Sequence, residues 1–170
     1  MDVYMAIVRW VHIGAGIVWI GILYYFNFIQ VPSFAQMEAP VRMNVIRFLV
    51  PRALLWFRYA ALVTVLAGLL WIISAMGAVP GYMDSVGFKS ILIGGTLGTI
   101  MLANVWMIIW PNQRRIIAAT TETLVNQTPA PPEQPRWARR AFLASRMNTA
   151  LSVPMLFFMV GAGHLPSLWS

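Results

Sequence analysis

The stretch YMAIVRWVHIGAGIVWIGILYYFNF, residues 4–28, decides the fold class because its apolar run is long enough to cross a bilayer. A helix needs about 20 predominantly apolar residues to span the roughly 30 Å of hydrocarbon. Three further segments of this kind follow, at residues 53–79, 88–110 and 149–169. We therefore expect one all-α domain over residues 1–170, an integral membrane bundle of four helices.

The composition agrees with a membrane protein. Hydrophobic residues make up 59% of the chain and charged residues 10%, whereas soluble domains have about 25% charged residues. Cysteine is absent, which excludes disulfides, thiolate metal sites and covalently attached c-type haem. The acidic start at Asp2 and the long first apolar run do not fit a cleaved signal peptide.

The distribution of arginine and lysine predicts the orientation in the membrane. Ten of the twelve basic residues lie in or beside the loops after spans one and three: Arg42, Arg47, Arg52, Arg58, Arg114, Arg115, Arg136, Arg139, Arg140 and Arg146. The other side carries Arg9 and Lys89. The positive-inside rule therefore places both loops in the cytoplasm and both termini in the periplasm of a bacterial inner membrane. The net charge of +7 then indicates contact with anionic lipid rather than nucleic acid.

The two long loops have their own structure. Residues 40–50 alternate apolar residues with arginine, which predicts a short amphipathic helix on the membrane surface. Residues 110–125 continue the third helix, with a possible kink at Pro111. Residues 128–135, TPAPPEQP, form an extended connector, and residues 136–146 form a basic amphipathic approach to the fourth span.

His12 and His164 are the only histidines in the chain. His12 lies roughly 8 residues, or ~12 Å, into the first span, and His164 lies roughly 5 residues before the end of the fourth. Because the number of spans is even, these two ends share one side, and both imidazoles fall at similar depth in the outer leaflet. An ionisable residue inside a membrane is a functional hypothesis by default. Two imidazoles facing each other across a bundle are typical of the axial ligands of a b-type haem.

The residues around the two histidines fit this hypothesis. Four glycines remove side-chain bulk where a flat macrocycle would approach the backbone, and Arg9 is placed one turn outward to pair with a propionate. The glycines are Gly14, Gly16, Gly161 and Gly163. The alternative is that these glycines serve helix packing and the histidines bond backbone carbonyls. Copper or zinc is a weaker alternative, for which Met5 and Met159 are the available soft ligands.

Other polar or small residues in the spans favour structural roles. Gly94 and Gly98 form a small-xxx-small step that predicts close helix packing. Asn104 predicts an interhelical hydrogen bond. Asn27 and Gln30 are expected to cap or solvate the inner end of the first span.

Three stretches resemble the membrane domain of bacterial urate hydroxylases, the urate oxidase N-terminal family: RWVHIGAGIVWIGILYYFNFIQVP (9–32), NVWMIIWPNQRRI (104–116) and SRMNTALSVPMLFFMVGAGH (145–164). In that family a membrane domain precedes a cytochrome c domain, and urate oxidation is coupled to the respiratory chain. The family's membrane domain has about twice as many helices, and this chain has no CxxCH motif. The resemblance therefore implies that the cytochrome c part is missing or lies on a partner. The first helix is also similar to those of four-helix protoporphyrinogen oxidases and copper-resistance membrane proteins.

These observations lead to one main hypothesis and two alternatives. The main hypothesis is a membrane subunit that holds one b-type haem between His12 and His164 and exchanges electrons with a c-type cytochrome. The first alternative is a urate hydroxylase-type oxidoreductase that works with a separate cytochrome. The second is a non-catalytic structural subunit of a respiratory or photosynthetic complex.

Overall fold

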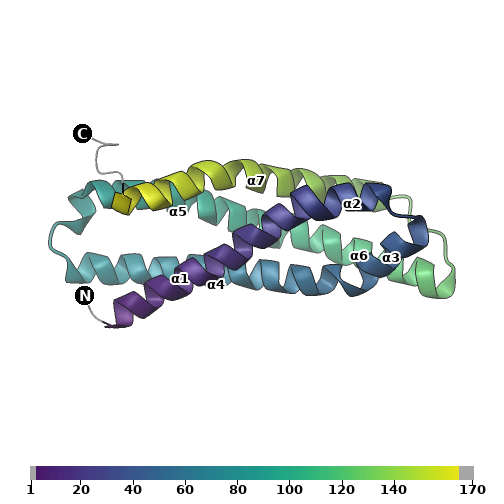
Figure 1. The fold of residues 1–170 in the computed structure, drawn as a ribbon, viewed down its shortest axis with the longest axis horizontal. Helices are drawn as coiled ribbons and strands as arrows, with labels where there is room; N and C mark the ends of the chain where they lie inside the picture. Colours follow the sequence, from purple (N-terminus) through teal and green to yellow (C-terminus); the bar gives the residue numbers. More distant parts are fainter. Residues whose placement is uncertain (1–2, 165–170) are drawn as a thin grey trace.

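A computed structural model describes residues 3–164, with only the backbone described at His164. Its helices join into four rods (Figure 1). The first rod consists of α1 (Val3–Tyr24), η1 (Tyr25–Gln30) and α2 (Val31–Gln36), and α3 (Ala39–Phe48) follows it. The second is α4 (Val50–Ala78), which the short helix η2 (Tyr82–Asp84) connects to the third. The third consists of α5 (Val86–Asn104), η3 (Val105–Ile109) and α6 (Trp110–Asn126), and the fourth is α7 (Gln134–His164).

Each rod is long and apolar enough to cross a membrane. No strand occurs among residues 3–164, so the all-α prediction is confirmed, and the four apolar rods fit a multi-pass membrane protein. The third and fourth rods extend beyond the apolar segments that the sequence marks. The fourth already begins at Gln134, so the basic stretch 136–146 belongs to α7 and the connector before it is shorter than expected.

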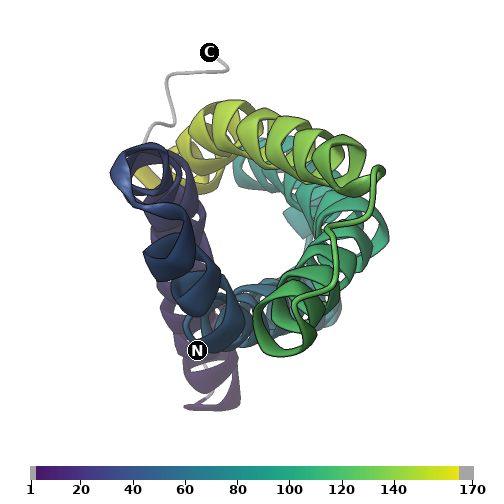
Figure 2. The same cartoon turned by 90° about the vertical axis from the view of Figure 1, so that its right-hand side faces the viewer.

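The rods form a ring when the molecule is viewed end-on (Figure 2). The start of α1, the η2 turn and the end of α7 share one end of the bundle, called here the histidine end. The opposite end contains α2, α3 and the connection between α6 and α7, and is called the arginine-rich end. α1 packs mainly along α4, and α7 packs along α5 and α6.

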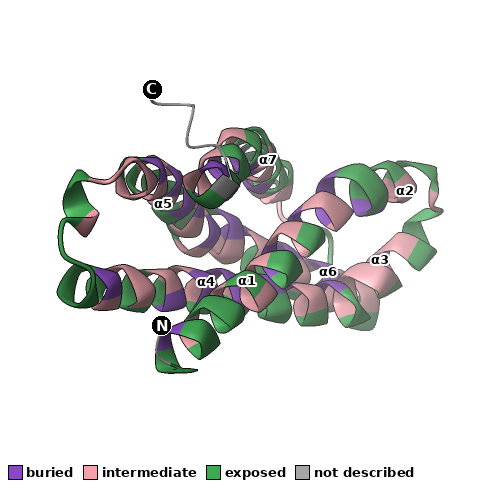
Figure 3. Cartoon of the chain, turned by 60° about the vertical axis from the view of Figure 1, so that its left-hand side comes forward, coloured by how far each residue is buried: buried purple, intermediate pink, exposed green. Residues whose placement is uncertain are grey.

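The core is a strip of apolar side chains inside the ring. Trp19, Leu23, Phe57, Met101 and Val105 are almost completely buried, while the outer faces of the rods are largely exposed (Figure 3). Many of the exposed residues are large and apolar. Such surfaces suit contact with lipid, because lipid tails are as apolar as the side chains themselves.

Two π-helical turns interrupt the rods, and each ends just before a proline. The turn η1 precedes Pro32, and η3 precedes Pro111. Proline has no N–H and its ring clashes with the carbonyl four residues earlier, so the wider turn accommodates it. The Val31 N–H bonds the Phe26 carbonyl and the Trp110 N–H bonds the Val105 carbonyl, both five residues back. The structure thus has a π turn where a kink at Pro111 was expected.

The π turn η1 also changes the position of Asn27 and Gln30. Both were expected to cap or solvate a helix exit, and this expectation is wrong. The rod continues to Gln36, and both side chains are buried. The Asn27 amide donates to the Leu23 carbonyl at 2.9 Å and to Ser145 Oγ at 2.8 Å.

Candidate histidine site

His12 lies on the inward face of α1, on the side that packs against α4. Its Nδ1 is 2.7 Å from the Thr64 carbonyl oxygen. Because a carbonyl only accepts hydrogen bonds, Nδ1 carries the proton in this contact. In the neutral ring the lone pair is then on Nε2.

The ring of His12 rests on Gly68, one turn beyond Thr64 on α4. A Cβ atom at Gly68 would lie 2.9 Å from His12 Nδ1 and 3.0 Å from Cε1. These distances are closer than real Cβ contacts, so the glycine is required by the ring's position. Thr64 and Gly68 together fix both the orientation and the tautomer of His12.

This arrangement has the form of a metal-ligating histidine. Such residues usually donate the second ring N–H to a carboxylate, backbone carbonyl or water, which orients the ring and raises the basicity of the ligating nitrogen. The same hydrogen bond also serves helix packing, since it joins α1 to α4. The contact therefore holds the ring in one orientation and leaves Nε2 as its unprotonated nitrogen.

His164 is the last residue of α7, at the same end of the bundle as the start of α1 (Figure 1). Its side chain lies outside the described part of the chain. The final turn of α7 packs on α5, where the Ala162 carbonyl would be 3.1 Å from a Cβ at Gly87. His12 contacts α4 instead, so the pairing of the two histidines stays a prediction.

The other predicted site residues differ in burial and in how closely other atoms approach them. Arg9 is exposed. A Cβ at Gly14 or Gly163 would meet no atom of the described chain within 4 Å, and one at Gly16 would meet Thr64 Cγ2 at 3.7 Å. Gly161 is buried. Close helix packing therefore does not require glycine at positions 14 and 163.

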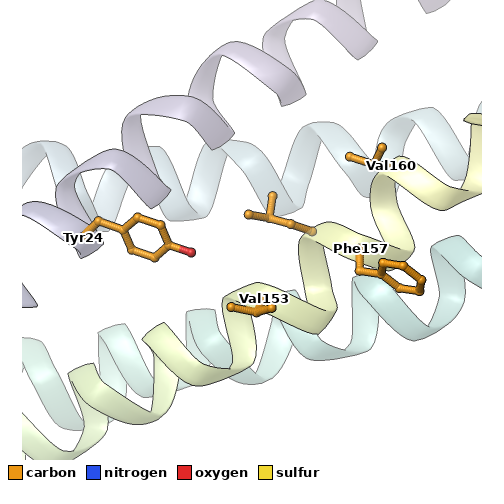
Figure 4. A pocket seen from close by; sticks show the side chains of 5 residues that line it. Tyr24, Val153, Phe157 and Val160 are labelled. Carbon is orange, nitrogen blue, oxygen red and sulfur yellow. The ribbon is translucent and has the colours of Figure 1, made fainter.

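An open apolar groove of about 380 Å³ lies between α1 and α7, on the histidine side of their contact. Figure 4 shows four of its residues labelled, with the Tyr24 hydroxyl directed toward α7. Tyr24 Oη lies 2.9 Å from Ser152 Oγ and joins the two helices. The lining residues are Tyr24, Val153, Leu156, Phe157 and Val160.

The described side chains offer few ligands for a metal ion. Within residues 3–164 no group of three or more His, Cys, Asp or Glu residues could hold a metal ion. The two methionines considered as copper ligands are engaged in packing: Met5 is buried, and Met159 Cγ would lie 3.1 Å from a Cβ at Gly94.

Sequence reasoning missed Thr64 and Gly68 because threonine and glycine are ordinary residues in membrane helices.

A pair of buried hydrogen-bond donors near the η2 turn was also missed. The Trp71 and Tyr82 rings meet edge to face, with centroids 6.0 Å apart. Trp71 Nε1 and Tyr82 Oη are buried without a partner in the described chain, and burial raises the pKa of the Tyr82 phenol.

Two structural predictions from the sequence are confirmed. Asn104 donates to Asn148 Oδ1 at 2.9 Å, and Asn148 donates in turn to the Met101 carbonyl at 2.9 Å. Gly94 is buried where a Cβ would lie 3.2 Å from the Met155 carbonyl oxygen, whereas a Cβ at Gly98 would meet no described atom within 4 Å, so close packing is confirmed at Gly94 only. These contacts join α5 to α7.

A comparison with protein families finds one that resembles part of the chain. The family model described as urate oxidase N-terminal matches residues 87–170. This segment, about half of the chain, is similar to the urate oxidase N-terminal family. The match contains the third and fourth rods and two of the three stretches on which the resemblance rests. Searches of curated proteins and of solved structures find no match.

The urate oxidase N-terminal match locates the shared part of the molecule. It includes η3, the contact between Asn104 and Asn148, and the whole of α7. His12 and its two contacts on α4 lie outside it. The match thus covers His164 and the third and fourth rods, whereas the contacts of His12 with α4 lie in the half of the chain that the match does not cover.

Proposed function

We propose that this chain is a haem-binding electron-transfer protein of the membrane. The observation that carries the proposal is the 2.7 Å contact of His12 Nδ1 with the Thr64 carbonyl. It leaves Nε2 available as a ligand and holds the ring in one orientation. A b-type haem bound there supplies one-electron chemistry.

His164 is the second residue that would hold the haem iron. Two features support this role: α7 ends at the end of the bundle where α1 begins, and no described atom crowds Gly14 or Gly163. The exposed Arg9 would hold a propionate at the membrane surface. The chain's own contribution is to orient two imidazoles, exclude water and present an edge of the cofactor to a c-type cytochrome.

Absorption spectra of the purified protein and two variants test the ligand assignment. With haem supplied during expression, the wild-type protein is expected to show a low-spin spectrum. His12→Ala and His164→Ala are each expected to abolish that spectrum, because six-coordinate iron needs both imidazoles. If only His12→Ala has this effect, His164 is not the second ligand.

A second candidate function is a urate hydroxylase-type oxidoreductase that uses a separate cytochrome. The family match over residues 87–170 favours it. Membranes containing the chain and an added c-type cytochrome are expected to consume urate and reduce the cytochrome. Deletion of the chain is expected to remove both activities. Urate consumption that continues unchanged after the deletion contradicts this function.

If neither haem nor urate turnover is found, the structural-subunit alternative stands. The hydrogen bond from His12 to Thr64 then serves only to join α1 to α4. In that case His12→Ala is expected to lower the stability of the protein without changing any absorption band.

A further inference from the structure

A second open groove, of about 450 Å³, lies between the third and fourth rods. One wall comes from the end of α5, η3 and the start of α6, and the other comes from α7. The lining residues are Asn104, Met107, Ile108, Asn112, Arg140, Leu143, Ala144 and Met147. Both walls are continuous helix faces, because the positions within each wall follow a spacing of three or four residues.

The groove has polar residues at both ends and apolar walls between them. The two rods are antiparallel, so Asn104 lies beside Met147 and Asn148, and the polar pair Asn112 and Arg140 lies nearer the arginine-rich end. Between them the walls are apolar, and Met107, Leu143 and Met147 are more than half exposed. Eight residues of helix separate Asn104 from Asn112, or about 12 Å.

Asn112 has an unused hydrogen-bond acceptor in this groove. The side chain is only 7% exposed, and its amide nitrogen donates to the Ile108 carbonyl at 2.7 Å. Its Oδ1 is buried without a partner in the described chain. A buried acceptor of this kind requires a donor, so a ligand that fits the groove should present a hydroxyl or N–H group.

The charge around the groove selects an anion. Arg140 lines it and is exposed. Further arginines flank it on α6 and α7: Arg114, Arg115, Arg136, Arg139 and Arg146. Between residues 104 and 148 the only carboxylates are Glu122 and Glu133. Basic pockets between membrane helices are typical sites for anionic lipid headgroups.

We propose that this groove binds an anionic phospholipid with a hydroxylated headgroup, of the phosphatidylglycerol type. Arg140 binds the phosphate, and a headgroup hydroxyl donates to Asn112 Oδ1. An acyl chain lies along Met107, Leu143 and Met147. The proposal does not depend on haem or on any activity with urate.

Binding is tested with the purified full chain in detergent, by native mass spectrometry and by thermal unfolding. Added phosphatidylglycerol is expected to bind and to raise the melting temperature. Phosphatidylcholine and soluble glycerol phosphate are expected to do neither, since one lacks net charge and the other lacks acyl chains. Equal effects of phosphatidylglycerol and phosphatidylcholine, or of glycerol phosphate, would overturn the proposal.

Arg140→Gln tests the phosphate contact, with Arg139→Gln as its matched control. Both side chains are exposed on α7, but only Arg140 lines the groove. Arg140→Gln is expected to weaken phosphatidylglycerol binding about tenfold, equivalent to ~1.4 kcal/mol, and Arg139→Gln is expected to have little effect. Equal losses in the two variants mean general surface attraction and contradict a defined site.

Asn112→Leu tests the headgroup hydroxyl. Phosphatidylethanol has the same charge as phosphatidylglycerol but no free hydroxyl. The wild-type protein is expected to prefer phosphatidylglycerol, and Asn112→Leu is expected to bind both lipids equally. Circular dichroism at the helical bands checks that each variant is folded. A folded Asn112→Leu protein that keeps the preference would overturn the role of Asn112.

Discussion

His12 depends on two residues of another helix for its orientation. The Thr64 carbonyl accepts its Nδ1 proton, and Gly68 makes room for its ring. A carbonyl hydrogen bond in the low-dielectric interior is costly to break, since the released groups have no water to bond. The position of the imidazole is therefore a property of the contact between α1 and α4.

Gly68→Ala is expected to displace the His12 ring. The added Cβ would lie 2.9 Å from Nδ1, and such overpacking typically costs about 1–3 kcal/mol of stability. Gly77→Ala is the matched control on the same helix, because a Cβ at Gly77 meets nothing within 4 Å. Thermal unfolding in detergent should separate the two variants. Equal melting temperatures would show that the ring does not rest on Gly68.

Tyr82 is expected to lower the stability of the protein at alkaline pH. Burial raises the pKa of its phenol above the ordinary 10.0, so the folded state holds the proton more tightly than the unfolded state. The resulting stability is fully present below pH 10.0 and is lost as the pH rises through the folded-state pKa. Tyr82→Phe is expected to flatten the fall in melting temperature above about pH 10. An unchanged alkaline slope would contradict this assignment.

The four rods are held together by a small set of polar contacts as well as by apolar packing. Asn104 and Asn148 join α5 to α7, while Asn27–Ser145 and Tyr24–Ser152 join the first rod to α7. Hydrogen bonds between membrane helices typically contribute about 0.6 kcal/mol each. Helix α7 is thus hydrogen-bonded both to the first rod and to α5.

Asn148→Leu is expected to weaken the contact between α5 and α7. The substitution removes the donor to the Met101 carbonyl and the acceptor for Asn104, and it leaves those groups unpaired at a cost of about 1–3 kcal/mol. Asn44→Leu is the control, since Asn44 is exposed and bonds only within α3. Unfolding of the two variants in detergent gives the comparison. If Asn148→Leu is no less stable than Asn44→Leu, the contact contributes nothing.

At the scale of whole elements, the hydropathy pattern predicted the four rods but not their ends. Apolar length marks a span directly, whereas α6 and the first half of α7 are polar helices whose extent depends on packing. The two π turns also had no sequence signal beyond Pro32 and Pro111, because a proline in a helix is equally compatible with a kink. Asn27 and Gln30 were wrongly expected at a helix end because the rod continues past η1.

At the scale of the whole molecule, the arginines other than Arg9 lie toward one end of the bundle. Arg58 stacks on Trp110, with its guanidinium carbon 3.8 Å from the ring centroid, so one of them also joins α4 to α6. By the positive-inside rule, this asymmetry predicts that the arginine-rich end faces the cytoplasm. Of the candidate site, the sequence pattern identified His12, but Thr64 and Gly68 required the packing of α1 on α4, which no local pattern specifies.

The absence of cysteine makes the orientation simple to measure. Single cysteines are introduced as Met83→Cys in the η2 turn and Thr128→Cys in the connection between α6 and α7, both exposed positions. A membrane-impermeant maleimide is added to cells whose outer membrane has been permeabilised. Labelling is expected for Met83→Cys and not for Thr128→Cys. The reverse pattern would show that the arginine-rich end faces the periplasm.

The haem content of the purified wild-type protein tests the central proposal most directly. The chain is expressed with ample haem, purified in mild detergent, and its absorption spectrum is recorded before and after reduction. We expect about one haem per chain with a Soret band that shifts on reduction, as for low-spin iron bound by two imidazoles. A folded protein that contains no haem under these conditions would contradict the proposal.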